Sequence, residues 1–394
     1  MEKLGTVLFG AGQVGKIAFY SLLKKKIDVD YVYDSDIRKH GEDFCGKKVL
    51  SKDEFEKISK SSKIYISNNY IKSVSDYLTK NKFTNFIDCN DLFKNLDLEE
   101  FKSKFTEYEW KNLKRDVSFH ISSGKKISNP SNSFTLKCLD IVVTERCSMK
   151  CKDCSNLMQY YEKPGNSDVE ILFDSLDKLM SVVDQVYEFR VLGGDPFMNK
   201  ELHKYVNRLV EYRNVENVVL YTNATILPKN ENLECLKNPK ISLEITNYGP
   251  NLSRKHDELL KLLENLKIEY RTRPPGVWND CGKLEKYERT EEELQRVFDN
   301  CCMNDVPSLL NGVIYKCPYS ANATNLKAVP FVEDEVVDLT KNYEKDSLKE
   351  KLKKFHLSEK PLTACNYCGG RDYKSKEIEP AIQVKKSLKY NRIV

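Results

Sequence analysis

The first third of the chain alternates short apolar runs with amphipathic stretches. The apolar runs, which we expect to be strands, lie at residues 4–9, 29–33, 63–67 and 85–88. Helical periodicity appears between them, after Gly15 and again over residues 70–80. Strands that alternate with helices are typical of a parallel sheet whose faces are covered by helices. We therefore expect an α/β domain over residues 1–113.

The first of these strands runs into the glycine-rich sequence Gly10-Ala11-Gly12-Gln13-Val14-Gly15. In a βαβ unit, glycines at this spacing permit a tight turn and the close approach of a phosphate to the helix N-terminus. Asp34 ends the second strand, near the place where an acid that binds a ribose is expected. The pattern predicts a Rossmann-like domain with a nucleotide or coenzyme at Gly10, Gly12, Gly15 and Asp34. The alternative is a retained fold that only docks a partner or another domain.

A polar, turn-rich segment at residues 114–133 predicts a linker, and a second βα repetition follows it. Its strands are expected at 136–143, 187–192, 218–222, 241–246 and 268–272. Ser167 and Glu170 are expected to form a capping box ahead of the first helix. Since catalytic groups of βα barrels lie at the carboxyl ends of the strands, polar residues at those ends are candidate site residues: Thr222, Asn223, Glu244, Asn247, Arg271 and Arg273.

Three cysteines directly follow the strand at 136–143. Cys147, Cys151 and Cys154 form a Cys-x3-Cys-x2-Cys run, and three thiolates on one short loop can hold three corners of a cubane iron–sulfur cluster. Such a cluster normally takes four cysteine ligands, so its fourth iron is left open for a group that is not protein. The alternative is a structural zinc site, which usually has closely spaced cysteine pairs and four ligands.

The strand at 187–192 leads into Gly193-Gly194-Asp195-Pro196. Together with the cysteine loop, this turn resembles the radical S-adenosylmethionine (SAM) superfamily, whose Gly-Gly-Glu-Pro element contacts the amino group of SAM. Asp195 replaces the usual Glu with a shorter carboxylate that accepts the same hydrogen bonds. Asp153 stands where many members carry an aromatic residue, which puts a stacking contact with adenine there in doubt.

The resemblance implies a partial (βα)6 TIM barrel over residues 134–290, with the amino and carboxylate groups of SAM chelated by the open iron. It also implies a contact with SAM from the Gly193–Pro196 turn. In such a barrel the polar residues at the strand ends, among them Asn223, Glu244, Asn247 and Arg271, are candidate contacts with SAM or substrate, and polar residues that order the loops are the alternative. One electron from the reduced cluster would cleave SAM, and the resulting 5′-deoxyadenosyl radical would abstract a hydrogen atom from the substrate. An electron donor such as flavodoxin or ferredoxin is the implied partner.

Six further cysteines come after the barrel strands: Cys281, Cys301, Cys302, Cys317, Cys365 and Cys368. The segment 309–318 predicts a hairpin with Asn311-Gly312 at its turn. A Cys before such a hairpin, a Cys after it and a distant Cys-x2-Cys resemble the SPASM and shorter twitch auxiliary-cluster domains, here at 291–394. The resemblance implies that one auxiliary [4Fe–4S] cluster is ligated by Cys301, Cys317, Cys365 and Cys368. Cys302 in place of Cys301, and a zinc site that uses Cys302, are the alternatives.

The charge balance and the cysteine content narrow the class of protein. The 394 residues include 64 basic and 59 acidic side chains, for a net charge of +5, which gives no strong electrostatic case for a nucleic-acid partner. No apolar run approaches the ~20 residues of a membrane span, and no secretory segment precedes the first strand. Thirteen cysteines in such a chain indicate metal ligation rather than disulfides, so we expect a cytoplasmic protein.

These patterns together predict an enzyme that abstracts hydrogen from a small molecule. The first domain resembles the nucleotide- or coenzyme-binding modules attached to bacterial surface-sugar enzymes, with Gly46 and Val49 in their Gly-x-x-Val segment. This favours oxidation or epimerisation of a sugar or nucleotide-sugar in surface-polysaccharide assembly. Cys281 is the candidate catalytic hydrogen-atom donor of an epimerase, with a plain loop thiol as its alternative. The competing functions are modification of a ribosomally made peptide, maturation of another enzyme, and, outside the enzymes, a non-catalytic metal-binding scaffold.

Overall fold

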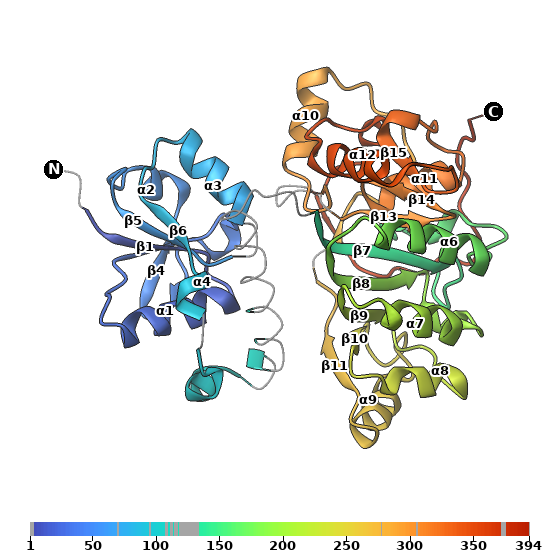
Figure 1. The fold of residues 1–394 in the computed structure, drawn as a ribbon, viewed down its shortest axis with the longest axis horizontal. Coiled ribbons are helices and arrows are strands. Elements are labelled where there is room, and N and C mark those ends of the chain that lie inside the picture. Colours follow the sequence, from blue (N-terminus) through green and yellow to red (C-terminus); the bar gives the residue numbers. More distant parts are fainter. Residues whose placement is uncertain are drawn as a thin grey trace. The chain divides into compact units, whose positions relative to one another are not determined.

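The computed structural model describes residues 4–68, 71–93, 96–106, 109, 110, 113, 117, 134–276, 278–304, 306–371 and 376–393. The predicted linker at 114–133 lies outside the described residues except for Val117. The chain forms two compact units, residues 1–132 and 133–394 (Figure 1).

The N-terminal unit contains a six-stranded sheet. In spatial order its strands are β3 (Asp43–Phe44), β4 (Lys47–Leu50), β2 (Tyr31–Tyr33), β1 (Thr6–Phe9), β5 (Lys63–Ile66) and β6 (Phe86–Asp88). All neighbours pair in parallel except β3, which pairs with β4 in the antiparallel sense. The helices are α1 (Gln13–Lys24), α2 (Lys52–Glu56), α3 (Ile71–Lys80) and α4 (Asn90–Phe93). The four strands predicted from the apolar runs are all present.

Helices pack on both faces of this sheet because side chains along a strand point alternately to opposite faces. Leu8 of β1 joins the core that contains α1 and α4, while Val7 and Phe9 join the core that contains α2 and α3. Both faces of the central strand are therefore buried, which explains its uninterrupted apolar sequence.

The C-terminal unit contains an eight-stranded sheet. In spatial order its strands are β11 (Glu269–Arg273), β10 (Ile241–Thr246), β9 (Val215–Thr222), β8 (Gln185–Gly193), β7 (Thr135–Thr144), β13 (Ser308–Leu310), β14 (Val313–Tyr315) and β15 (Val336–Asp338). The strands β7 to β11 and β13 run in parallel, whereas β14 and β15 are antiparallel to their neighbours. The five strands predicted between residues 136 and 272 are all present.

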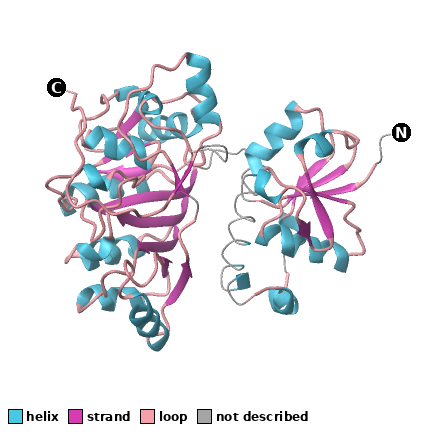
Figure 2. Cartoon of the chain, turned by 180° about the vertical axis from the view of Figure 1, so that it is seen from behind, coloured by secondary structure: helices cyan, strands magenta, loops and turns pink. Residues whose placement is uncertain are grey.

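Helices α6 (Val169–Met180), α7 (Leu202–Glu211) and α9 (His256–Asn265) lie on one face of this sheet (Figures 1 and 2). The strand residues that point to them are apolar, such as Ile141 and Phe189, and they form the largest buried core. The remaining elements of the unit are α8 (Glu231–Glu234), β12 (Trp278–Asn279), α10 (Glu291–Asp299), α11 (Pro318–Asn325), α12 (Lys345–Leu357) and β16 (Glu377–Ile378).

The opposite face of the same strands is rich in polar side chains. Asp140 on β7 pairs with Arg190 on β8 at 2.9 Å, and Asp140 is only 1% exposed. The guanidinium of Arg190 lies 5.0 Å from the ring centre of Tyr221 on β9, whose hydroxyl donates to Glu188 at 3.2 Å. Charged and hydroxyl groups thus line part of the sheet face opposite α6, α7 and α9.

The start of α6 differs from the predicted capping box. Asp168 is the N-cap, and its Oδ1 accepts a hydrogen bond from the N–H of Ile171 at 2.9 Å. Ser167 instead donates through Oγ to the carbonyl of Val142 at 2.5 Å. The prediction of a box between Ser167 and Glu170 was wrong because a contact with β7 takes up the serine hydroxyl.

This cap can be tested by mutation. Asp168→Ala is expected to lower the free energy of unfolding by about 1 kcal/mol, the usual cost of removing an N-cap side chain. Glu170→Gln is expected to be nearly neutral, because Glu170 takes no part in the cap. Urea unfolding of both variants measures the difference, and an equal loss in both would contradict the assignment of Asp168 as the cap.

The predicted hairpin is present as β13 and β14. Asn311 and Gly312 form its two-residue turn with φ angles of 50° and 79°, the left-handed geometry that an Asn-Gly turn favours. β13 also pairs in parallel with β7, through Ser308 beside Asp140. The hairpin therefore continues the sheet of the preceding strands, and the division predicted at residue 290 stays a prediction.

Candidate functional site

The cysteine loop after β7 rests on the two glycines that end β8. A Cβ atom on Gly193, which has a φ of 146°, would lie 1.8 Å from the carbonyl oxygen of Thr144. A Cβ atom on Gly194 would lie 2.1 Å from the carbonyl oxygen of Arg146 and 2.8 Å from Cβ of Cys147. The N–H of Gly194 donates to Thr144 at 2.9 Å. Only glycine fits here, so the Gly-Gly pair sets the position of the loop.

Two of the three thiols of this loop accept hydrogen bonds from amide side chains. Cys147 Sγ accepts from Nδ2 of Asn223 at 3.6 Å, and Cys151 Sγ accepts from Nε2 of Gln383 at 3.2 Å. Burial raises the pKa of Cys147 and Cys154, and it raises the pKa of Cys151 to about 12. These thiols would stay protonated at neutral pH by themselves, so their thiolates need a bound cation or cluster.

A segment near the C-terminus covers the same loop. The N–H of Lys152 donates to the carbonyl of Ile382 at 2.7 Å, and the N–H of Val384 donates to that of Lys150 at 2.8 Å. The N–H of Lys150 also donates to Oε1 of Gln383 at 2.8 Å. The sequence analysis missed Gln383 because no motif links it to a loop 232 residues away.

Asp195 is fully buried and organises the end of β9. Its Oδ1 accepts from the N–H of Phe197 at 3.0 Å, and its Oδ2 accepts from the hydroxyl of Thr222 at 2.9 Å and the N–H of Asn223 at 3.0 Å. Burial raises the pKa of Asp195, and these hydrogen bonds lower it. The carboxylate therefore holds Asn223 beside Cys147. A contact between Asp195 and SAM stays a prediction.

The predicted residues at the ends of β10 and β11 come together. Glu244 is 1% exposed and pairs with Nε of Arg271 at 2.5 Å and Nε of Arg273 at 2.9 Å. Two guanidinium groups around one carboxylate leave an excess positive charge at this sheet edge. Asn247 lies at the same edge, where its Oδ1 accepts from the N–H of Gly249 at 2.9 Å and its N–H donates to the carbonyl of Arg273.

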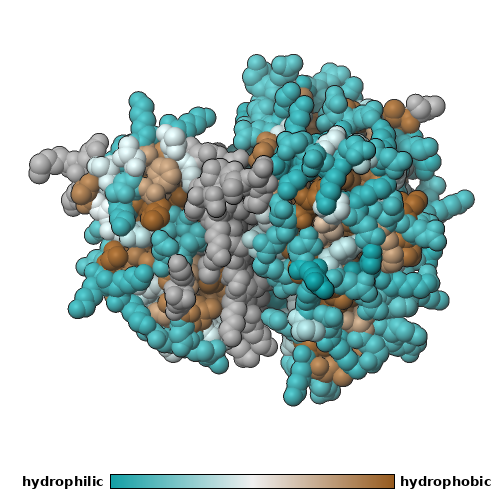
Figure 3. Space-filling model, viewed as in Figure 1, coloured by the Kyte–Doolittle hydropathy of each residue, from teal (hydrophilic) through white to brown (hydrophobic). Residues whose placement is uncertain are grey.

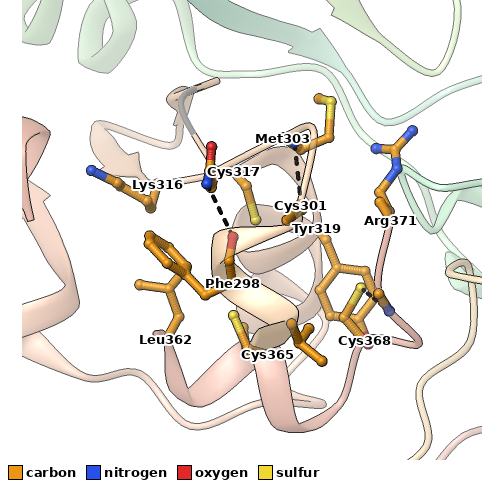
Figure 4. Close-up of a pocket in the computed structure, with 14 residues that line it drawn as sticks. Phe298, Cys301, Met303, Lys316, Cys317, Tyr319, Leu362, Cys365, Cys368 and Arg371 are labelled. Atoms are coloured by element: carbon orange, nitrogen blue, oxygen red, sulfur yellow. Dashed lines mark hydrogen bonds between the residues drawn. The ribbon is translucent and has the colours of Figure 1, made fainter. Parts of the chain in front are cut away.

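The second predicted set of cysteines lines one cavity. Cys301, Cys317, Cys365 and Cys368 all face it, together with apolar side chains that include Phe298, Leu362 and Tyr319 (Figure 4). Cys302, the alternative to Cys301, is exposed and does not line the cavity.

Backbone N–H groups point at three of these sulfurs. Cys301 accepts from Met303, Cys317 from Ser320 and Cys368 from Gly370, each at 3.4 Å. Burial raises the pKa of both Cys301 and Cys365 to about 12. As in the first loop, deprotonation of these buried thiols requires a bound positive centre.

The cysteine sulfurs are spread apart within each set. In the described part of the chain, no three His, Cys, Asp or Glu side chains gather closely enough to hold a single metal ion. A four-iron cluster is larger than one ion and its ligands stand farther apart, so both cysteine sets stay candidates for cluster binding.

Cys281 lies next to both cysteine sets. It is 2% exposed and shares one buried cluster of residues with Cys154, Cys317, Cys365 and Cys368. Its Sγ therefore faces protein rather than solvent, and its role as a hydrogen-atom donor stays a prediction.

In the N-terminal unit, the glycine loop is closed by Asp34. Oδ2 of Asp34 accepts from the N–H of Ala11 at 2.7 Å and pairs with Nζ of Lys39 at 2.9 Å. A Cβ atom on Gly15 would lie 2.0 Å from the carbonyl oxygen of Gly10, whose φ is 124°. Gly12 has no neighbour within 4 Å of such a Cβ. The four predicted residues thus come together, with the Asp34 carboxylate engaged by the loop itself.

One known protein family matches the part of the chain that contains the first cysteine loop. Residues 136–267 match the family described as a 4Fe-4S single cluster domain. This range contains Cys147, Cys151 and Cys154. The match confirms the prediction of an iron–sulfur cluster in this part of the chain.

Curated relatives match over a similar but shorter stretch. GTP 3′,8-cyclase from Sulfurovum sp. is 28% identical over 97 residues, which are 24% of this chain and 29% of that protein. GTP 3′,8-cyclase from Campylobacter lari is 30% identical over 91 residues, which are 23% of this chain and 28% of that protein. The chain thus spans less than a third of the length of these relatives.

Solved structures cover more of the chain than these relatives do, at lower sequence identity. BtrN in complex with AdoMet and 2-DOIA has a TM-score of 0.42 at 15% identity, covering 62% of this chain and 98% of that one. The structure of anSMEcpe with bound AdoMet has a TM-score of 0.39 at 13% identity, covering 65% of this chain and 93% of that one.

Among the described residues, no helix has the length and apolar character needed to cross a membrane. The face in Figure 3 is mainly hydrophilic, with hydrophobic residues in small separate groups.

Proposed function

We propose that the chain is a radical SAM enzyme whose first [4Fe–4S] cluster is held by Cys147, Cys151 and Cys154. The observation that carries the proposal is the fit of Gly193 and Gly194 against the backbone of this loop. Two motifs 39 residues apart in sequence thereby form one site. When bound, the reduced cluster supplies the electron that cleaves SAM to the radical that abstracts a substrate hydrogen.

The surrounding residues suit the binding of SAM and the orientation of the loop. The side chain of Asn223 donates to the Cys147 sulfur, and the carboxylate of Asp195 accepts a hydrogen bond from the backbone N–H of Asn223. Hydrogen bonds to cluster sulfurs are among the factors that set the reduction potential. Arg271 and Arg273, which share Glu244, offer donors to the carboxylate of SAM. The Gly193–Pro196 turn and Asn247 complete the proposed SAM site.

The proposal includes an auxiliary [4Fe–4S] cluster of the SPASM or twitch type. Cys301, Cys317, Cys365 and Cys368 line one cavity, which supports Cys301 over the exposed Cys302 as the ligand. Arg289 supports the Cys-x2-Cys segment, because its Nη1 donates to the carbonyls of Cys365 at 2.5 Å and Cys368 at 2.8 Å. A zinc site is the alternative, and metal analysis separates the two.

For the substrate we propose a sugar or nucleotide-sugar that is oxidised or epimerised, with flavodoxin or ferredoxin as the electron donor. The polar sheet face with Asp140, Arg190, Glu188 and Tyr221 supports a substrate rich in hydroxyl groups. The N-terminal unit adds support. Its parallel strands lie in the order third, second, first, fourth, fifth along the chain, as in dinucleotide-binding folds.

Iron content and EPR spectra test the proposed function. The wild-type protein, prepared without oxygen and reduced with dithionite, is expected to hold about eight irons. The Cys147→Ala/Cys151→Ala/Cys154→Ala variant is expected to hold about four, because only the auxiliary site is left. Addition of SAM should change the spectrum of the wild type only. Zinc in place of iron, or a spectrum that SAM leaves unchanged in the wild type, would contradict the radical mechanism.

A further inference from the structure

One short segment, residues 280–282, separates the two cysteine sites. On the side of the first loop, a Cβ atom on Gly282 would lie 2.6 Å from the carbonyl oxygen of Asp153 and 2.8 Å from that of Cys154. Gln159 stabilises the contact between Gly282 and the first cysteine loop, because its Nε2 donates to the carbonyls of Gly282 at 2.7 Å and Cys154 at 3.3 Å. No side chain fits between this segment and the first cysteine loop.

The same segment touches the second cysteine set on its other side. A Cβ atom on Gly369 would lie 2.2 Å from the carbonyl oxygen of Asp280. Cys368 Sγ lies 3.9 Å from the carbonyl oxygen of Cys281. Three consecutive residues therefore form a wall shared by both sites.

Arg371 lies beside this wall. It lines the cavity of the second cysteine set, and its guanidinium points away from Cys365 in Figure 4. Its carbonyl accepts from the N–H of Cys302 at 3.1 Å. Arg371 thus borders the cavity in which the four cysteines of the second set meet.

The charge of Arg371 also reaches the buried carboxyl of Asp140, where it opposes the burial that raises the pKa of that group. Asp280, the acidic residue of the shared wall, pairs with Lys283 at 2.8 Å. Within the described ranges, no carboxylate lies at ion-pair distance from Arg371. A cation in a partly buried setting without such a partner interacts strongly with any negative charge nearby.

We propose that Arg371 is the counter-charge of the auxiliary cluster site and makes the reduction potential of that cluster less negative. The inference rests on the proposed function. A cluster with thiolate ligands carries a net negative charge, and reduction adds one more. A fixed guanidinium close by stabilises the reduced state more than the oxidised state. Arg371 acts through this field and need not touch substrate.

The test uses the Cys147→Ala/Cys151→Ala/Cys154→Ala protein, in which only the auxiliary cluster is left. Arg371→Gln and Arg371→Lys are added to it, and the midpoint potential is measured by an EPR-monitored redox titration. Arg371→Gln is expected to shift the midpoint to a more negative potential, and Arg371→Lys, which keeps the charge, is expected to restore much of the difference. An unchanged midpoint in Arg371→Gln would overturn the proposal.

Controls separate this inference from the proposed function. Arg296→Gln removes an exposed arginine of α10 and should leave the midpoint unchanged. If the triple-cysteine protein holds no iron while the wild type holds about four, the auxiliary cluster and the role of Arg371 fail, and the first cluster stands. If it holds iron but Arg371→Gln has the parent's midpoint, only the role of Arg371 fails. Should Arg371→Gln lose its iron, the decision passes to Arg371→Lys, where a large negative shift contradicts the proposal and a small one supports it.

Discussion

Gly194→Ala is expected to empty the first cysteine loop of its cluster. The added methyl group would lie 2.1 Å from the carbonyl oxygen of Arg146 and 2.8 Å from Cβ of Cys147, so the loop has to move away from β8. Forcing an extra methyl group into a packed site typically costs about 1–3 kcal/mol, and a clash with backbone belongs at the upper end. Iron analysis should show a fall from about eight irons per chain to about four, and urea unfolding should show the loss of stability.

Gly276→Ala is the matched control for this substitution. A Cβ atom on Gly276 would meet no atom within 4 Å, and its φ lies outside the left-handed region. The control should keep both its iron and its free energy of unfolding. Full iron content in Gly194→Ala would show that the Gly-Gly turn does not position the cysteines, and the main support for the proposed function would fall.

Asp195→Ala is expected to give the second large effect. It removes the acceptor of three hydrogen bonds in a fully buried position and leaves the N–H of Phe197, the hydroxyl of Thr222 and the N–H of Asn223 without it. A buried polar group without a partner costs roughly 1–3 kcal/mol, so the free energy of unfolding should fall by about 3 kcal/mol or more. Asn223 would also be released from its place beside Cys147, and the EPR signal of the first cluster should change.

Two further variants sharpen the result. Asp195→Asn keeps the shape and one acceptor oxygen, so its loss of stability should be smaller than that of the alanine variant. Asp195→Glu introduces the residue common in radical SAM proteins, but the extra methylene has no free space in a fully buried site and should destabilise the protein. Stability equal to wild type in Asp195→Ala would mean that water replaces the carboxylate, and the organising role of Asp195 would be lost.

The features that the sequence predicted well depend only on residues that are close to one another in the sequence. The strands follow from uninterrupted apolar runs, such as Val218–Leu220 in β9. The hairpin follows from Asn311-Gly312, because that pair adopts left-handed geometry at low cost. In the same way, the spacing of Cys147, Cys151 and Cys154 within eight residues was enough to predict an iron–sulfur cluster.

The features that sequence could not give depend on contacts between distant segments. Ser167 has the right spacing for a cap, but the carbonyl of Val142 competes for its hydroxyl. Asp34 has the right position for a ribose contact, yet it accepts hydrogen bonds from Ala11 and Lys39. Arg371 belongs to no motif, and only the folded chain places it in the cavity of the second cysteine set. In each case the side chain interacts with residues that are distant in the sequence or outside the motif, and the local spacing does not reveal these partners.

The late position of Gln383 in the sequence determines when its contacts with the first cysteine loop can form during biosynthesis. Its side chain and the neighbouring backbone complete one side of the loop that holds Cys151, although the two residues are 232 positions apart in the sequence. A ribosome translates the cysteine loop long before it translates residues 381–384. That side of the loop is thus still open while the rest of the protein is being made. The contacts of residues 382–384 with the cysteine loop can therefore form only after translation has passed residue 384.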